Sequence, residues 1–328
     1  MKKYIFLTIA VLFTTSYYGQ VLQKRTLKLM GSRFDITIVA KDTILALKNI
    51  EVAINEITRI EKLISSWDKN SQTSEIIRNA GVKPVKVDKE LYRLIERSLA
   101  ISKLTDGAFD ISYASVDEIW KFDGSMKSMP SAKAIKASVS KVGFQNIILN
   151  KKNQTVFLKL KGMKIGFGAI GKGYAADKTK KLLISLGVKA GIINASGDMN
   201  TWGTQPNGKD WKVAITNPMN SKNAFAILPI SNKAIVTSGD YEKYVTFNNK
   251  RYTHIINPKT GYPETEIISV SVFAPKAELA DALATSIFVM GTDIGLDKIN
   301  QLKDIECIII NNNGTIHTSK NINLNTND

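Results

Sequence analysis

The sequence contains one cysteine and two histidines among its 328 residues. A single cysteine cannot form an intramolecular disulfide bond, and we expect Cys307, in the strand-like run IECIII, to be a buried, unreactive thiol. His317 sits on an Asn-Gly hairpin near the C-terminus and is expected to be solvated. His254 is therefore the one imidazole suited to chemistry, with a structural role on its predicted strand as the alternative.

The sequence also lacks a long low-complexity linker and a hydrophobic run that spans a bilayer comfortably. Met1–Gln20 has two lysines, the apolar run YIFLTIAVLF and then small and polar residues, which is the layout of a secretory signal peptide cleaved near Gly19 or Gln20. Tyr17 and Tyr18 fit a cleavage site poorly, so an uncleaved N-terminal anchor is the alternative. A lipid anchor would need a cysteine in this segment, and there is none.

Negative charge is scarce relative to positive charge, with 29 Asp and Glu against 45 Lys and Arg and a formal net charge of +16. Such a balance favours polyanionic partners in general. The lysines are scattered rather than arranged in a stripe, and no nucleic-acid-binding motif accompanies them. We therefore expect no nucleic-acid partner and at most a local phosphate site.

A hydrophobic content of 44 % is enough for one large core or two moderate ones. Strand and helix patterns alternate irregularly, which argues against a doubly wound parallel sheet. We expect an α+β fold with a mixed, largely antiparallel sheet and packed helices, in one compact body (21–328, after a signal peptide at 1–20) with a smaller lobe from the lysine-rich residues 113–145. Strands are predicted at 26–40 (broken at Met30-Gly31), 147–149, 155–160, 191–194, 213–215, 226–230, 234–236 and 270–273, and helices at 42–65, 88–104, 174–186 and 277–290.

Two polar residues interrupt the apolar helix predicted for Ala277–Met290. Asp281 and Thr285 are four residues apart and therefore lie on one helix face. A carboxylate in such an apolar segment costs several kcal/mol unless something pairs with it, and Mg²⁺ is one such partner. The alternative is that Asp281 caps or pairs locally while Thr285 bonds its own helix backbone.

A glycine-rich stretch, KIGFGAIGKGYAADK (164–178), precedes another predicted helix. Backbone N–H groups at a helix N-terminus, together with the ammonium of Lys172, can bind a phosphate. The GxxxxGK[ST] spacing of a Walker A loop is absent, and a tight glycine turn with a surface lysine is the alternative.

Several short motifs share the order and spacing of one family: MGS, SSW…SEIIRN, TDGAFD, GAIGKGYAADK, SGD, TSGDYEKY, HIINPKTGYP and ADALATSIFVMG. From about Leu27 to Gly291 the chain resembles the ApbE family, the FAD:protein FMN transferases. The resemblance implies an enzyme that binds FAD and Mg²⁺, transfers FMN to a threonine or serine hydroxyl of a target flavoprotein, and releases AMP. It further implies targets among subunits of membrane redox pumps of the Nqr and Rnf type, a place on the periplasmic side of the inner membrane, and a loose membrane association.

The resemblance assigns roles to matching positions. Asp281 and Thr285 resemble the side-chain metal ligands, joined by the backbone carbonyl of Ala169, and Lys172 resembles a lysine near the FAD pyrophosphate. His254 is the candidate for helping to deprotonate the incoming hydroxyl. The cofactor-binding positions implied are Met30 and Trp67 against the flavin, Asn79 where the family has an asparagine that discourages plain FAD hydrolysis, Asp106, Gly107 and Ala108 along the cofactor, and Ile255.

The sequence departs from the family pattern at a few positions. Gly166 stands where many members have Asp, Asn257 and Lys259 alter the HI[IV]DPRTG motif, and Ala284 replaces an acidic metal ligand of some members. We expect these changes to weaken metal or adenosine binding without removing the pair Asp281 and Thr285. Two other functions stay open, an FAD pyrophosphatase that releases FMN and AMP, and a periplasmic flavin-binding protein without catalysis.

Overall fold

A computed structural model of the chain describes residues 19–116, 119–216, 224–239 and 244–322. Nearly all of the predicted signal peptide, most of the C-terminal run NINLNTND and four residues of the TSGDYEKY motif lie outside these ranges. Within them, none of the helices combines the length and the apolar composition that a bilayer span needs.

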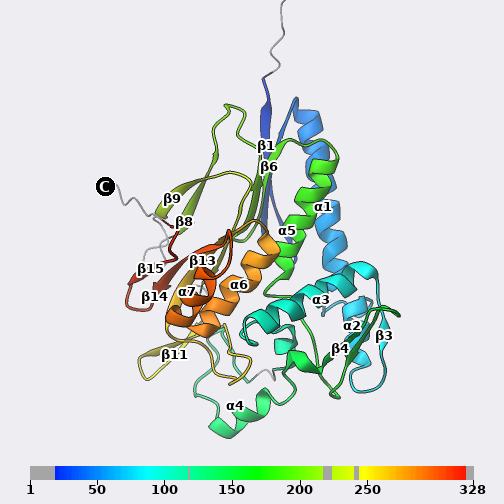
Figure 1. Ribbon diagram of the computed structural model, residues 1–328, viewed down its shortest axis with the longest axis vertical. Helices are drawn as coiled ribbons and strands as arrows, with labels where there is room; N and C mark the ends of the chain where they lie inside the picture. Colours follow the sequence, from blue (N-terminus) through cyan, green and yellow to red (C-terminus); the bar gives the residue numbers. More distant parts are fainter. Residues whose placement is uncertain (1–18, 117–118, 217–223, 240–243, 323–328) are drawn as a thin grey trace, which may run out of the picture.

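An eight-stranded sheet forms the larger part of the molecule, and all of its described ladders are antiparallel (Figure 1). The strand order is β1-β2-β6-β7-β10-β13-β14-β15. These strands are β1 (Val21–Leu29), β2 (Ser32–Ala40), β6 (Ala190–Ala195), β7 (Asp198–Trp202), β10 (Ala234–Gly239), β13 (Ile267–Ala274), β14 (Glu306–Asn311) and β15 (Ile316–Thr318). The predicted α+β class with a largely antiparallel sheet is confirmed.

Three helices cover one face of this sheet, and a β-hairpin covers the other. The helices are α1 (Thr43–Ile64), α5 (Gly171–Ser185) and α6 (Ala277–Met290); α7 (Thr292–Asn300) follows α6, and the hairpin is β8 (Trp211–Thr216) with β9 (Ala224–Ile230). Alternation along β13 explains both layers, because Val270 and Val272 join the core under the helices whereas Phe273 joins the core under the hairpin. Strand β13 is therefore buried throughout.

A smaller lobe packs below this body (Figure 1). It holds the three-stranded sheet β3-β5-β4, and its elements are α2 (Gln72–Arg78), β3 (Val85–Lys86), α3 (Lys89–Leu104), η1 (Ile111–Ser115), α4 (Ala132–Ser138), η2 (Phe144–Asn146), β4 (Ile147–Asn150) and β5 (Thr155–Leu158). Its core includes Ile64 from α1, Tyr174 from α5 and Ala282 from α6, so both cores share these three helices. The lobe is longer than the lysine-rich stretch that composition singled out. A separate two-stranded sheet, β11 (Tyr244–Phe247) with β12 (Lys250–Thr253), makes a hairpin that turns at Asn248-Asn249.

Local signals in the sequence set several element ends. The β1–β2 hairpin turns at Met30 and Gly31, which both adopt positive φ (49° and 72°). The Asp42 carboxylate accepts the Leu45 N–H at 2.7 Å and begins α1. Cys307 is fully buried in β14, as predicted, whereas His317 is half-buried on β15 beside Asn311 rather than solvated.

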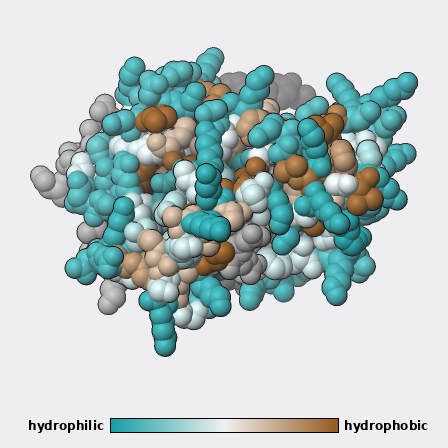
Figure 2. All heavy atoms as spheres, turned by 90° about the horizontal axis from the view of Figure 1, so that it is seen from below, coloured by the Kyte–Doolittle hydropathy of each residue, from teal (hydrophilic) through white to brown (hydrophobic). Residues whose placement is uncertain are grey.

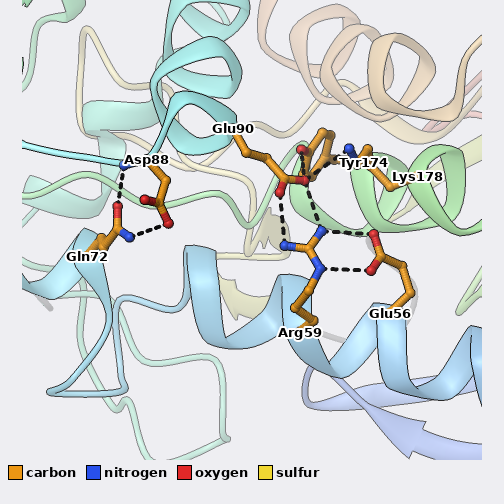
Figure 3. A network of polar contacts seen from close by, with 7 residues as sticks. All are labelled: Glu56, Arg59, Gln72, Asp88, Glu90, Tyr174 and Lys178. Atoms are coloured by element: carbon orange, nitrogen blue, oxygen red, sulfur yellow. Dashed lines mark hydrogen bonds and ion pairs between the residues drawn. The ribbon is translucent and has the colours of Figure 1, made fainter. Parts of the chain in front are cut away.

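A polar network joins three helices where the body meets the lobe (Figure 3). The Glu90 carboxylate on α3 accepts two N–H bonds from Arg59 on α1, at 2.9 and 3.0 Å, and the Tyr174 hydroxyl of α5 at 2.6 Å. Lys178 lies 3.2 Å from the same carboxylate. These bonds fix the lobe against the helix that carries the glycine stretch.

The molecular surface on the side of the lobe is mainly hydrophilic. Figure 2, which views the molecule from that end, shows hydrophilic side chains over most of the face and hydrophobic residues in small separate patches. This pattern fits the scattered lysines of the sequence.

Candidate active site

The glycine-rich stretch and the segment that carries Asp281 meet where helices α5 and α6 cross. The Gly173 N–H, in the first turn of α5, donates to Oδ2 of Asp281 on α6 at 3.1 Å. The helices approach so closely that a Cβ at Gly173 would lie 2.2 Å from the carbonyl oxygen of Ala277. Only glycine therefore allows this crossing, and the glycine stretch and the Asp281 face come together as predicted.

The glycine stretch differs from the prediction in one respect. We expected the helix to begin at Tyr174, but α5 begins at Gly171, so Gly171 and Gly173 belong to its first turn. Close contact with Ala277 explains the glycine at 173, which serves packing rather than a loop turn. The Gly173 N–H of this first turn still donates to Asp281.

Three charged side chains gather at this crossing. The Lys172 ammonium forms an ion pair with Asp198, the first residue of β7, and the field of Asp281 also acts on it. Asp198 and Asp281 are 1 % and 4 % exposed, and their carboxyl groups interact directly. One ammonium thus pairs with Asp198 and lies in the field of a second buried carboxyl group, that of Asp281.

The pKa values of the three groups reflect this arrangement. Burial, and then the neighbouring Asp198 carboxylate, raise the pKa of Asp281 well above its ordinary value, against the opposing effects of Lys172 and the Gly173 N–H. Burial also raises the pKa of Asp198 despite its ion pair with Lys172. Burial alone would lower the pKa of Lys172, but Asp198 and Asp281 outweigh it and raise that pKa. Ionisation of both carboxyl groups is therefore disfavoured at this centre, and a bound cation would stabilise their ionised forms.

The groups around Asp281 fit Mg²⁺. No cluster of three or more His, Cys, Asp and Glu side chains among the described residues can hold a metal, so further ligands must be hydroxyl, backbone or water oxygens. Thr285 is half-buried one turn along α6. The Ser286 hydroxyl donates to the carbonyl of Ala282 at 2.6 Å, whereas the Thr285 hydroxyl makes no hydrogen bond with a described residue. Ala169 lies in the turn directly before α5. Asp281 and Thr285 therefore offer side-chain oxygens for an ion on one face of α6, and the backbone carbonyl of Ala169 is the candidate for a third ligand.

Met30 and Tyr113 border the glycine stretch. The Met30 N–H donates to Glu61 at 3.0 Å, and its Cε lies 3.7 Å from where a Cβ of Gly171 would be. The Tyr113 hydroxyl lies against Gly168, where an added Cβ would approach it to 2.3 Å. Met30 was predicted as a flavin contact, whereas Tyr113 was not singled out because no motif marks it.

Asp106, Gly107 and Ala108 form the turn after α3 and border two cavities. The Asp106 carboxylate pairs with the Lys259 ammonium at 2.8 Å, and both residues line a cavity of about 280 Å³ on one side and one of about 330 Å³ on the other. The larger cavity is also lined by Val289, one turn after Thr285 on α6. The face of α6 that carries Asp281 and Thr285 thus continues into this cavity, which has room for part of a dinucleotide.

Other predicted site residues have no described contact with the Asp281 centre. Trp67 is 88 % exposed after α1, and the Asn79 side chain donates to the carbonyl of Glu75 at the end of α2. His254 is not on a strand as expected, because β12 ends at Thr253 and His254 is an exposed residue just beyond it. Ile255 packs at the edge of the main core.

The residues that depart from the family pattern have structural explanations. Asn257 builds the turn before Lys259, since its Oδ1 accepts the N–H groups of Lys259 and Thr260 at 3.0 and 3.3 Å and its Nδ2 donates to Glu264 at 2.9 Å. Ala284 is fully buried in the main core.

Sequence reasoning missed the role of two carboxylates. Asp198 entered only as part of the SGD motif, although it is the acidic residue in the apolar run GIINASGDM. The sequence does not single out Asp177 on α5, because a charged residue inside a helix pattern does not indicate which group it will bind.

Comparison with known proteins identifies the family of this chain. The sequence model of the ApbE family matches residues 30–309. A protein of Klebsiella pneumoniae (strain 342) named FAD:protein FMN transferase is 31 % identical over 290 residues, which cover 88 % of this chain and 89 % of that relative. A protein of the same name from Escherichia coli (strain K12) is 32 % identical over 239 residues, covering 71 % of this chain and 68 % of the relative.

The fold is also shared with solved structures. The ApbE protein of Thermotoga maritima superposes with a TM-score of 0.83 at 29 % identity, over 92 % of this chain and 97 % of that one. The apo form of the flavinyl transferase ApbE from Pseudomonas stutzeri gives 0.82 at 23 % identity, over 93 % and 96 %, which supports the fold alone. With a family match through both lobes and the site formed from the matching motifs, this chain belongs to the ApbE family.

Proposed function

We propose that this protein is a flavin transferase that moves the FMN half of FAD to a threonine or serine hydroxyl of a target flavoprotein and releases AMP. The observation that carries the proposal is the buried centre of Lys172, Asp198 and Asp281 beside the N-terminus of α5. An ammonium, the positive end of a helix dipole and a carboxylate suited to a divalent cation are the groups that a diphosphate requires.

The reaction is a phosphoryl transfer. The acceptor oxygen attacks the phosphorus of the FMN half, the bond from that phosphorus to the bridging oxygen breaks, and AMP leaves with that oxygen. The hydroxyl proton leaves to a base, for which His254 is our candidate. Mg²⁺ bound by Asp281, Thr285 and the Ala169 carbonyl would supply positive charge against the diphosphate.

The residues of this chain supply binding and orientation. Lys172, held at the site by Asp198, adds a fixed positive charge, and the positive end of the α5 dipole adds to its field. The cavity beside Asp106 and Val289 extends from the same face of α6 and offers room for one end of the dinucleotide. Fixing FAD at both places would convert much of the barrier into positioning.

We further propose that the protein is exported and acts on the periplasmic side of the inner membrane, on redox-pump subunits of the Nqr or Rnf type. The signal-like segment at 1–20 supports export, and the lack of a cysteine pair makes the fold independent of disulfide formation there. The departures at Gly166, Asn257 and Ala284 are expected to affect the strength of binding rather than the reaction.

The test is to incubate the protein with FAD and Mg²⁺, with and without an acceptor subunit, and to measure AMP release and the acceptor mass. We expect FMN on the acceptor and AMP release that depends on the acceptor. Rapid AMP release without acceptor would instead indicate an FAD pyrophosphatase. Binding of FAD with neither AMP release nor a mass shift would indicate a flavin-binding protein.

A further inference from the structure

Helix α6 has no side-chain cap of its own, because Lys276 at its N-cap position makes no capping hydrogen bond. The first N–H groups of a helix need an acceptor from elsewhere. Asp177, 100 residues earlier on α5, provides it: its Oδ1 accepts the Ala277 N–H at 2.9 Å and its Oδ2 accepts the Glu278 N–H at 3.0 Å. One carboxylate thus caps a helix to which it does not belong.

One turn away, a carboxylate of α6 caps α5 in return. Helix α5 also lacks a side-chain cap at its N-cap residue Ile170, and its Gly173 N–H is accepted by Asp281 from α6. Gly173 lies against Ala277, the residue that Asp177 caps. The two helices therefore cap each other, and the two capping carboxylates lie four residues from Gly173 on α5 and four residues from Ala277 on α6.

We propose that Asp177 is a positioning residue for the reaction, which sets the depth and rotation of α6 on α5 and so holds Asp281 and Thr285 at the glycine stretch. The inference rests on the proposed function, since it assigns Asp177 to the same site. Asp177 does not touch the substrate; it acts through the placement of Asp281.

A chain of polar contacts fixes Asp177 in turn. Asn200 on β7 donates to the Asp177 carboxylate, and the Lys180 ammonium donates to Oδ1 of Asn200 at 2.8 Å and to the carbonyl of Thr201 at 2.9 Å. Strand β7 also carries Asp198, the partner of Lys172. The cap therefore ties α5, α6 and β7 into one frame around the charged centre.

The chemistry requires a carboxylate at this position. Both oxygens of Asp177 accept an N–H of α6, and an asparagine could accept only one of them while its own NH₂ faced the other donor. Asp177→Asn keeps the size of the side chain but loses one half of the cap. Leu183→Ala is a matched control, because Leu183 is fully buried in the core on the same helix and its loss lowers stability without touching the cap.

The experiment measures Mg²⁺ affinity by calorimetry on FAD-free protein, together with hydrogen exchange at Gly173, Ala277 and Glu278. In Asp177→Asn we expect faster exchange at all three amides and Mg²⁺ binding that is about 10- to 100-fold weaker, the usual effect of losing a residue that supports a metal ligand. Leu183→Ala should keep the affinity of the original protein. Should Asp177→Asn fail to fold, Asn200→Ala, which removes only the outer support, is expected to give smaller changes in the same direction.

Unchanged Mg²⁺ affinity and unchanged exchange at Gly173 in a folded Asp177→Asn or Asn200→Ala variant would overturn the inference. Equal weakening by Leu183→Ala would also overturn it, because a general loss of stability would then account for the effect. Failure of the proposed function would be recognised separately, as absence of FMN transfer by the unmodified protein, since the exchange at Gly173 needs neither FAD nor an acceptor.

Discussion

The backbone N–H of Gly173 donates a hydrogen bond to Oδ2 of Asp281 over 3.1 Å, across 108 residues of sequence. This bond joins the N-terminus of α5 to a buried carboxylate of α6. The positive end of the α5 dipole and the Lys172 ammonium therefore act on the same point as Asp281. A diphosphate and a divalent cation can share that point, which is why the crossing matters for function.

The crossing depends on the absence of a side chain at Gly173. In Gly173→Ala the new Cβ would meet the Ala277 carbonyl at 2.2 Å, and backbone cannot move aside as a side chain can. We expect a loss of about 1–3 kcal/mol in the free energy of unfolding, measured by urea denaturation, and a loss of transfer activity.

Gly171→Ala is the matched comparison for this variant. Its Cβ would lie 2.9 Å from Cδ1 of Ile64, the flexible end of a side chain that can rotate away. We expect Gly171→Ala to lose less stability than Gly173→Ala. An equal loss in both variants would contradict the explanation that contact with the Ala277 backbone makes Gly173 necessary.

Lys172 is expected to offset the two buried carboxyl groups. Its side chain is 28 % exposed and that of Asp198 only 2 %. Lys172→Met should cost about 3 kcal/mol in the free energy of unfolding, because it leaves a buried charge unpaired. Added Mg²⁺ should stabilise this variant more than the original protein, as measured by thermal unfolding with and without the ion.

Lys178→Met on the same helix is the control for Lys172→Met. Lys178 pairs with Glu90 nearer the surface, so we expect a loss of no more than about 1 kcal/mol. Similar stability of the two methionine variants would show that the charged centre needs no counter-ion.

Glu90 predicts a dependence of stability on pH. Burial would raise its pKa, but the bonds from Arg59, Tyr174 and Lys178 outweigh burial and lower the pKa from 4.5 to about 2. Since the folded pKa lies below the unfolded one, ionised Glu90 stabilises the fold fully above about pH 5, and this contribution is lost as the pH falls toward 2.

Glu90→Gln should therefore be less stable than the original protein at pH 7 by roughly 1–2 kcal/mol, after allowance for solvent screening. The difference should shrink as the pH falls through the same range, in urea titrations at several pH values. A constant difference from pH 7 to pH 3 would argue against an ionised Glu90 in the network.

The ion pair of Asp106 and Lys259 predicts an effect on binding alone. Both side chains are largely exposed and both border the two cavities, so their removal should leave the melting temperature unchanged. Asp106→Asn, which tolerates the positive φ (48°) of this position, and Lys259→Ala should each weaken FAD binding severalfold in a fluorescence titration. The loss of binding free energy in the double variant should be no larger than the sum of the two single losses. Undiminished FAD affinity in both single variants would place the dinucleotide elsewhere.

Much of the fold followed from local signals in the sequence. The ends of α6 were predicted to the residue, because Pro275 stops β13 and Gly291 ends the apolar run. The β1–β2 hairpin followed from alternation with a break at Met30-Gly31. In the site, Asp281 stood out because a carboxylate in an apolar helix needs a partner.

The features of the fold and the site that local signals did not predict depend on contacts between residues far apart in sequence. The start of α5 was missed because Gly171 and Gly173 usually disfavour a helix, and only the contact with Ala277 explains them. Asp177 and Asp198 are recognised through their partners, which no local pattern reveals. Local sequence patterns predict most helices and strands. The hydrogen bond at the centre of this site joins residues 108 positions apart, which no local pattern indicates.

The most direct test of the account compares FMN transfer by the original protein, Asp281→Asn and the control Ser286→Ala at low Mg²⁺. Asn keeps an acceptor for the Gly173 N–H but loses the charge, whereas Ser286 bonds only its own helix. We expect Asp281→Asn to remain folded and to lose transfer by roughly a thousandfold, equivalent to about 4 kcal/mol, while Ser286→Ala transfers normally. Transfer by Asp281→Asn at the rate of the original protein would contradict the account.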